Sequence, residues 1–419
     1  MRSYSLFITD NNLLSAKIHM YFGEDLTIMK KLTYSLSAAL LALTIMPWQT
    51  STASAEEAVA TVTPFTSEIT VQTEANFTNA ATVDTFIKQA VRNHVSVINM
   101  TVKQDSDVNG SSGYVFYNSE LVKEATGFTE FDALADVIDE AHQYGIKVNA
   151  VVPQFQDKAA IDKNSSWQMR TINDKGRFSA YTGNNGSTYY VNPFEPDVQT
   201  YERSIIKEVV TNYNVDGVVL SGLDFDTDRV DMNTSTRNAF QSANGFDPDT
   251  IDFTKSNSNK LNTWNTWKAE QLAAYVKAVN EDIATIKPDL ALGVFTVSPT
   301  LTGTSQDISL FKDSVDFILP IADFQTLGYS ADWVYSNNGI LKATEAKLAT
   351  TVPNAKTTTE EKPAVTIIPS LNIELNTADV QNIYNGMRTN APTITSVNYA
   401  VKGQWTDAMF NNVGVRNSF

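Results

Sequence analysis

The 419-residue chain contains no cysteine, which excludes disulfide bonds, thiolate metal sites and a cysteine nucleophile. Histidine is nearly as scarce, with three residues in the whole chain. Lys and Arg (31) are outnumbered by Asp and Glu (47), and the net charge of −16 argues against a nucleic-acid partner, which requires cations opposite the phosphates. These shortages leave carboxylates and aromatic rings as the groups available for chemistry.

A long apolar run is also lacking. The run from Leu36 to Met46 is shorter than the about 20 residues that a membrane-spanning helix needs. Lys30 and Lys31 precede it and Ala53-Ser54-Ala55 follows it, which is the pattern of a cleaved signal peptide, with an uncleaved anchor as the alternative. We therefore expect an over-extended start at residues 1–28, a signal peptide at 29–55, and a secreted or cell-wall-associated bacterial protein with no transmembrane segment after cleavage.

The remaining residues, 56–419, are predicted to form a single domain in which strands alternate with helices. Short runs rich in Val and Ile indicate eight buried strands. They are expected at Glu68–Thr73, Val95–Val102, Ile146–Val152, Gly217–Leu223, Leu290–Val297, Val315–Ile321, Ala364–Leu371 and Ile394–Val401.

Apolar residues at helical spacing predict the connecting helices. The clearest are Thr82–Asn93, Phe131–Tyr144, Val198–Tyr213 and Trp264–Ile286, the last of which ends just before Pro288. Eight strands with helical crossovers predict the α/β class and a (β/α)8 TIM barrel, with long loops after strands two, three and four.

In such a barrel the active site lies where the strands end. Asp224 follows the fourth predicted strand and Glu374 follows the seventh, so these carboxyl groups are expected on opposite sides of the barrel mouth. Two facing carboxyl groups are what glycoside hydrolysis requires, since one protonates the leaving oxygen and the other acts as nucleophile or base. Asp226 and Asp323 are candidate supporting carboxylates, and Trp405 is a candidate platform for a sugar ring.

Other chemistries find less support. His94 and His142 fall on predicted helices away from the strand ends, so neither a Ser-His-Asp triad nor a histidine metal site is expected. No phosphate-binding loop or dinucleotide fingerprint occurs, and no cofactor is expected. Asp105–Gly110 matches the first half of a calcium loop, but Phe116 stands where a bidentate Glu is required, and Asp224–Asp228 lacks the following Gly. A structural calcium ion therefore stays open only as an alternative to solvated loops.

Several motifs together resemble a known family. They are Val95–Tyr117, Asp132–Val152, Tyr190-Val191-Asn192-Pro193, Val198–Tyr213, Val215-Asp216-Gly217 and Trp267–Gln271 with Lys287-Pro288. In order and spacing they resemble exported bacterial proteins of the glycosyl-hydrolase-family-10-like kind, over nearly all of residues 56–419. The resemblance implies an eight-stranded barrel acting on polysaccharide, with Asn192 and Glu270 near the cleft.

The chain departs from the family pattern at two strands. Leu220, Ser221 and Gly222 stand where an aromatic residue and two Asp are usual, and Pro320–Phe324 replaces a Pro-Gln-x-Tyr-Trp motif. The leading hypothesis is a secreted hydrolase of a cell-wall or extracellular polysaccharide, with Asp224 as general acid and Glu374 as nucleophile or base. The alternatives are a non-catalytic carbohydrate-binding barrel at the cell surface, which the two departures favour, and another hydrolase or lyase on the same fold.

Overall fold

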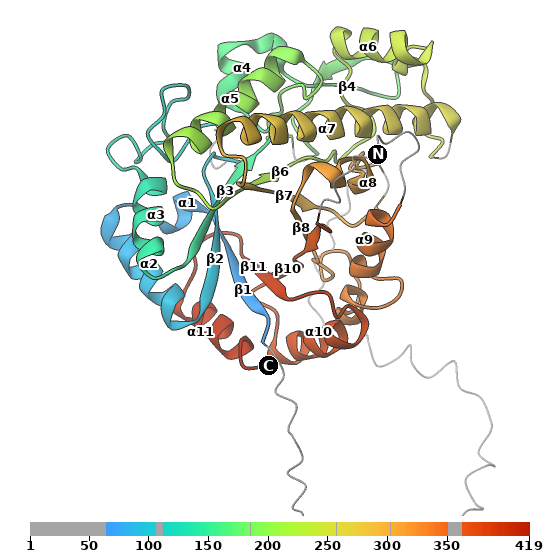
Figure 1. Ribbon diagram of the computed structural model, residues 1–419. Coiled ribbons are helices and arrows are strands. Elements are labelled where there is room, and N and C mark those ends of the chain that lie inside the picture. Colours follow the sequence, from blue (N-terminus) through green and yellow to red (C-terminus); the bar gives the residue numbers. More distant parts are fainter. Residues whose placement is uncertain (1–63, 106–111, 185, 257, 302, 351–362) are drawn as a thin grey trace, which may run out of the picture. The chain divides into compact units, whose positions relative to one another are not determined.

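The computed structural model describes residues 64–105, 112–184, 186–256, 258–301, 303–350 and 363–419. The segment from Thr61 to Phe419 forms one compact unit. Its centre is a parallel sheet with helices around the outside (Figure 1). The predicted start at 1–28 and signal peptide at 29–55 lie outside the described residues.

All eight predicted strands are present, in the sheet order β10-β11-β1-β2-β3-β6-β7-β8-β9. Neighbouring strands pair in parallel, as the alternation with helices requires. The strands are β1 (Thr66–Val71), β2 (Val95–Thr101), β3 (Lys147–Pro153), β6 (Gly217–Ser221), β7 (Ala291–Thr296), β8 (Phe317–Pro320), β9 (Thr366–Ile367), β10 (Ser370–Asn372) and β11 (Ser396–Ala400). The predicted (β/α)8 barrel is confirmed.

The seventh predicted strand differs from the expectation, because it is split into β9 and β10 by Ile368 and Pro369. Proline has no N–H to donate to the ladder, so regular pairing stops there. The barrel nevertheless closes at this point: the Ile368 N–H donates to the Ile318 carbonyl at 2.9 Å, and the Pro369 carbonyl accepts from the Asn398 N–H at 3.0 Å. β9 thus pairs with β8 while β10 pairs with β11.

The helices follow the predicted positions, with boundaries shifted by a few residues. The outer helices are α2 (Ala80–Arg92), α3 (Ala133–Gln143), α5 (Pro196–Asn212), α7 (Asn259–Ile286), α9 (Ile340–Leu348), α10 (Thr377–Asn390) and α11 (Asp407–Arg416), with short segments α1 (Thr73–Asn76), α8 (Ile308–Phe311), η3 (Lys312–Ser314) and η4 (Ala331–Val334). None of the helices in the described ranges is both long and apolar enough to cross a membrane.

The long loops after strands two to four are confirmed. The loop after β3 carries α4 (Lys158–Lys163), η1 (Ser165–Trp167) and an antiparallel hairpin of β4 (Arg170–Ile172) and β5 (Phe178–Ala180), and the loop after β6 carries α6 (Thr234–Asn244) and η2 (Pro248–Thr250). These additions gather over one side of the barrel, next to α5 and α7 (Figure 1).

The interior of the barrel has two unlike halves. On the side of β6, β7 and β8 it is filled by an apolar cluster of Val151, Val219, Phe295, Leu319 and Ile368. Because each of these large side chains contributes about 1.5–3 kcal/mol on burial, this half resembles an ordinary hydrophobic core.

On the side of β1, β2 and β11 the interior is polar. Asn99 Nδ2 donates to Glu68 Oε2 at 3.1 Å, Asn149 Nδ2 donates to Asn99 Oδ1 at 2.9 Å, and Asn398 Nδ2 donates to Ser370 Oγ at 2.8 Å. Gly217 makes room for this layer, since a Cβ there would meet Asn149 Oδ1 at 2.6 Å. Burial raises the pKa of Glu68 despite the hydrogen bond from Asn99.

Candidate active site

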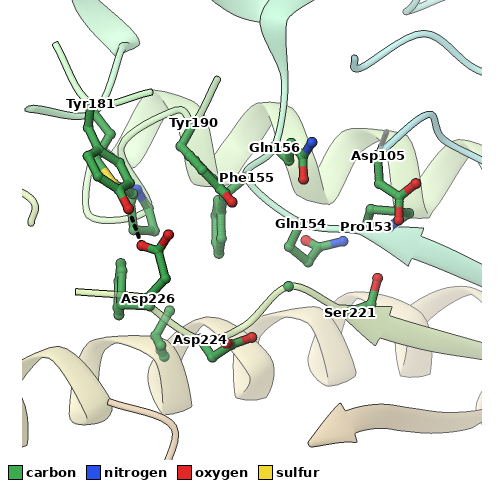
Figure 2. A pocket seen from close by; sticks show the side chains of 15 residues that line it. Asp105, Pro153, Gln154, Phe155, Gln156, Tyr181, Tyr190, Ser221, Asp224 and Asp226 are labelled. Atoms are coloured by element: carbon green, nitrogen blue, oxygen red, sulfur yellow. Dashed lines mark hydrogen bonds between the residues drawn. The ribbon is translucent and has the colours of Figure 1, made fainter. Parts of the chain in front are cut away.

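A cavity of about 210 Å³ opens where β3 and β6 end, the position at which barrels of this class place their active sites. Pro153, the last residue of β3, and Ser221, the last of β6, form part of its wall (Figure 2). The volume lies below the about 300–1,000 Å³ typical of ligand pockets, so the cavity suits one small unit of a larger ligand.

The loop after β6 supplies two carboxyl groups to the cavity. Leu223 and Phe225 are buried, and the alternating Asp224 and Asp226 are exposed to the cavity. Gly222 has a φ of +72°, which favours glycine, and a Cβ there would meet the Gln154 carbonyl oxygen at 3.1 Å. The turn at Gly222 therefore directs this loop past the end of β3.

The Asp224 carboxyl is reached by solvent through the cavity, but protein atoms surround it closely. This burial raises the pKa of Asp224 to about 6, and the nearby Asp226 carboxylate adds to the rise. A carboxyl group with such a pKa exists in both protonation states near neutral pH, as a general acid must.

A third carboxyl group comes from a different strand. Asp105 lies beyond the end of β2 and also lines the cavity (Figure 2). Burial raises the pKa of Asp105 to about 6, with a further rise from the Glu74 carboxylate and a partial reduction from Lys402. The cavity thus has acidic groups on two separate walls.

Two tyrosine rings cover the other side of the cavity. Tyr181 and Tyr190 stack with centroids 5.8 Å apart, and the Tyr181 hydroxyl donates a hydrogen bond to the Asp226 carboxylate. Burial raises the pKa of Tyr190 to about 12, helped by Asp226 and Asp224, and raises the pKa of Tyr181 as well. Both phenols therefore keep their protons at neutral pH, and the proton of Tyr181 is donated to Asp226.

A buried ionic group lies behind the cavity wall. Lys103 Nζ is 2.9 Å from Asp157 Oδ2 and 2.7 Å from Glu202 Oε2, and all three side chains are 0% exposed. Lys103 precedes Asp105 by two residues, and Asp157 directly follows Gln156 of the wall. The group therefore ties the end of β2, the loop after β3 and helix α5 together beneath the cavity.

The predicted catalytic pair is only partly represented in this cavity. Asp224 lines it, whereas Glu374 is exposed in the turn between β10 and α10 and is not among the lining residues. The Glu374 N–H donates to Asn372 Oδ1 at 2.8 Å, which fixes the turn. The structure does not bring Glu374 into the cavity that holds Asp224.

The other predicted site residues, the supporting carboxylates and the residues expected near the cleft, are dispersed. Asp226 lines the cavity, but Asn192 is buried beside it, donating to Thr236 Oγ1 at 2.9 Å and accepting from the Phe194 N–H at 2.9 Å. Asp323 is half-buried and accepts from the Thr326 N–H at 3.2 Å.

Glu270 and Trp405 both lie outside the cavity. Glu270 is exposed on α7, in a separate shallow hollow with Asn262 and Thr266. Trp405 is 5% exposed, and its Nε1 donates to the Thr70 carbonyl at 3.0 Å, so its ring packs inside the molecule. Its face does not offer the open platform on which a sugar ring stacks.

The scarce histidines take positions away from the cavity. His142 on α3 pairs with Asp216 at 2.8 Å, just before β6 begins, and His94 is exposed after α2. Within the described ranges no group of three or more His, Asp or Glu side chains is arranged to hold a metal ion. Of the two calcium-like strings, the first lies outside those ranges at positions 106–110, and the second contributes Asp224 and Asp226 to the cavity.

The sequence matches the family model for glycosyl hydrolase-like 10 over residues 68–351. The chain belongs to this family. Its relatives include an S-layer-related protein of Niallia circulans, 25% identical over 40% of this chain, and the glycosyl hydrolase DigH of Escherichia coli K12, 24% identical over 39% of it. These matches span only 11% and 35% of the two relatives, so the chain aligns with a minor part of each.

Solved structures agree on the fold of this glycosyl hydrolase-like 10 protein. The glycoside hydrolase domain of PgaB from Bordetella bronchiseptica superimposes with a TM-score of 0.62 at 14% identity, over 83% of this chain and 96% of that domain. The catalytic domain of a β-amylase from Paenibacillus polymyxa gives 0.53 at 10% identity, over 84% and 95%. At such identities the likeness concerns the barrel itself.

Sequence reasoning missed several residues of the cavity in this glycosyl hydrolase-like 10 chain. The sequence pattern places Asp105 only in a calcium-like loop, although it lies a few residues beyond a strand end, where the barrel rule points. Tyr181 and Tyr190 come from the excursion after β3, and no local pattern indicates that this excursion folds back over the loop that follows β6.

Proposed function

We propose that the protein is an exported glycoside hydrolase that cleaves a cell-wall or extracellular polysaccharide by carboxylate acid/base chemistry. Membership of the glycosyl hydrolase-like 10 family supports the reaction class. The signal-like pattern at residues 29–55 supports export, and the S-layer-related relative is consistent with a site of action at the cell surface.

One observation carries the proposal: Asp224 and Asp105 come from different strands, line one cavity at the barrel mouth, and both have a pKa of about 6. Hydrolysis needs one protonated and one ionised carboxyl group on opposite sides of the scissile bond. We assign the general acid to Asp224, as the sequence predicts, and the nucleophile or base to Asp105. Glu374 remains the sequence-based candidate for the second role.

The substrate contacts follow from the walls of the cavity. The Tyr190 hydroxyl lines the cavity as a donor for a sugar oxygen, and the Tyr181 hydroxyl donates to Asp226 and so orients this carboxylate for accepting a hydrogen bond from a sugar hydroxyl. Gln154 is itself fixed, because its Oε1 accepts from the Tyr275 hydroxyl and its Nε2 donates to the Val152 carbonyl at 2.7 Å. The proposed reaction uses neither a cofactor nor a metal ion.

The test measures reducing ends released from a panel of bacterial wall and extracellular polysaccharides by residues 56–419. Asp224→Asn and Asp105→Asn are each expected to lower the rate at least about 100-fold, the scale of a lost general acid or base. Asp84→Asn, on the exposed face of α2, serves as the matched control. The wild-type rate should fall as the pH rises above about 6, because Asp224 loses its proton there.

Glu374→Gln separates the two candidates for the second carboxyl group. If Glu374→Gln abolishes hydrolysis while Asp105→Asn does not, the assignment of Asp105 is wrong and the sequence-based pair stands. If both cavity variants keep full activity, the cavity is not the active site.

The position of Glu374 outside the cavity lining favours a second candidate, a non-catalytic barrel that binds polysaccharide. A wild-type protein that releases no reducing ends from any glycan, yet co-sediments with one insoluble wall polymer, would support this candidate. Weakened co-sedimentation of Asp226→Asn would then locate the binding site in the same cavity.

A further inference from the structure

Helix α7 carries a lysine that lies fully inside the protein. Lys268 is 0% exposed, and its Nζ has no hydrogen-bond partner anywhere in the described part of the chain. The ammonium group lies instead against two aromatic faces, 4.7 Å from the centroid of Phe225 and 5.3 Å from that of Trp264. Burial lowers the pKa of Lys268 to about 7, partly offset by Asp228. An ammonium group without a polar partner is costly to bury, so its presence calls for a reason.

Packing does not provide that reason. Trp264, Lys268 and Leu272 recur at four-residue intervals and form one stripe of α7, on which apolar side chains are expected. Trp264 and Leu272 are buried, and a methionine at 268 would fill the same space without a charge. What a lysine adds to this stripe is its attraction to aromatic faces.

The ring beneath which Lys268 lies belongs to the loop of the candidate active site. Phe225 stands between Asp224 and Asp226 and itself lines the cavity. The loop is anchored at Phe225, whose N–H donates to the Thr304 carbonyl at 2.9 Å, and at Asp228, whose carbonyl accepts from Trp264 Nε1 at 2.8 Å. Lys268 contacts the ring of Phe225 in this anchored segment.

We propose that Lys268 is a positioning residue of the active site: its ammonium group, held between Phe225 and Trp264, fixes the loop that directs Asp224 and Asp226 into the cavity. The ordering of the loop is independent of any reaction, whereas the consequence for catalysis rests on the proposed function. The two parts are therefore tested by separate measurements.

Hydrogen exchange of the peptide covering residues 222–228 tests the ordering. Lys268→Met retains the packing volume and removes the charge, and we expect exchange of these amides to become at least about fivefold faster. Lys277→Met, an exposed lysine of the same helix, should leave exchange unchanged. Lys268→Arg should restore slow exchange, because guanidinium also stacks on aromatic faces. Unchanged exchange in Lys268→Met would overturn the proposal.

Hydrolysis tests the catalytic consequence. Lys268→Met should lower kcat about tenfold with little change in KM, since a misdirected carboxyl group affects the reacting geometry more than binding. Faster exchange with an unchanged kcat would overturn the assignment to catalysis. If the wild-type protein hydrolyses no glycan, the proposed function fails, and exchange alone still decides whether Lys268 orders the loop. Should Lys268→Met not fold, Phe225→Leu removes the aromatic face while leaving Lys268 in place, and the same faster exchange is expected.

Discussion

Two lysines of this protein are equally buried and have opposite surroundings. Lys103 lies against the Asp157 and Glu202 carboxylates, and Lys268 lies against the rings of Phe225 and Trp264; both are 0% exposed. The first ties the cavity wall together from behind, and the second lies beneath the loop that carries Asp224.

The two lysines differ in the direction in which their pKa is shifted from the usual value. Burial alone would lower the pKa of Lys103, but Asp157 and Glu202 outweigh it, so the pKa is raised. For Lys268 burial prevails, and its pKa falls to about 7. Full burial therefore does not determine whether a lysine is charged; the partners at its ammonium group do.

The largest effect is expected on removing the paired lysine. Lys103→Met leaves the Asp157 and Glu202 carboxyl groups buried without their cation, a change that costs about 3–5 kcal/mol of unfolding free energy. Urea unfolding at pH 7.5 measures this loss. A loss below about 1 kcal/mol would mean that the three groups do not act as an ionic unit.

Lys268→Met should raise the unfolding free energy, whereas Lys103→Met lowers it. The unfolded chain keeps this lysine's proton up to a pKa of about 10.5, and the folded chain releases it near pH 7, so the wild-type stability rises with pH between these values. At pH 6 the variant should be more stable by on the order of 2–4 kcal/mol, and its gain should shrink towards pH 10. Thermal or urea unfolding across this pH range measures it, and a destabilised variant at pH 6 would contradict the prediction.

Glu202→Gln tests the surroundings of Lys103 by changing one of the two carboxylates that contact it. Burial raises the pKa of Glu202 to about 7, with Lys103 lowering it and Asp157 raising it. The folded protein then binds more protons than the unfolded chain between about pH 4.5 and 7, and stability falls as the pH rises through that window. Glu202→Gln should make this fall smaller, as urea unfolding at several pH values would measure. Glu281→Gln, an exposed control, should leave the pH dependence as it is.

The smallest effect is expected at the surface. Lys277 pairs with Glu281 at 2.7 Å, but the two side chains are 67% and 62% exposed. Lys277→Met should therefore change the unfolding free energy by less than about 0.5 kcal/mol. A larger change in the same urea experiment would show that α7 responds to the loss of any lysine charge. The effect of Lys268→Met could then not be attributed to the surroundings of Lys268.

The strands were predictable because burial on both faces leaves a visible trace in the sequence. Runs such as Val148–Val152 are apolar nearly throughout, and each occurs once between helical patterns. The split of the seventh strand was also within reach, since Pro369 cannot donate to a ladder. Both features depend only on a few consecutive residues, so they can be predicted from the sequence.

The site was only half predictable because it is assembled from distant segments. Asp224 follows directly from the end of a strand, but Tyr181 and Asp105, which line the same cavity, reach it along loops whose course depends on tertiary packing. The sequence places Trp405 on an open loop, and the hydrogen bond to Thr70 that draws its indole inside has no signature in the sequence. Lys268 likewise reads as one more charged residue of a helix until its neighbours are known.

The polar half of the barrel interior has a consequence for how the strands find their alignment. An apolar cluster distinguishes less sharply between two alignments, because hydrophobic side chains of similar volume replace one another at low cost. The amides of Asn99, Asn149 and Asn398 distinguish them more sharply, since each donates a hydrogen bond to a particular group on a neighbouring strand. In a displaced strand these amide groups would be buried without hydrogen-bond partners, which is energetically costly. The asparagines thus specify the strand alignment with which the barrel closes, and burial of the apolar half stabilises the closed barrel.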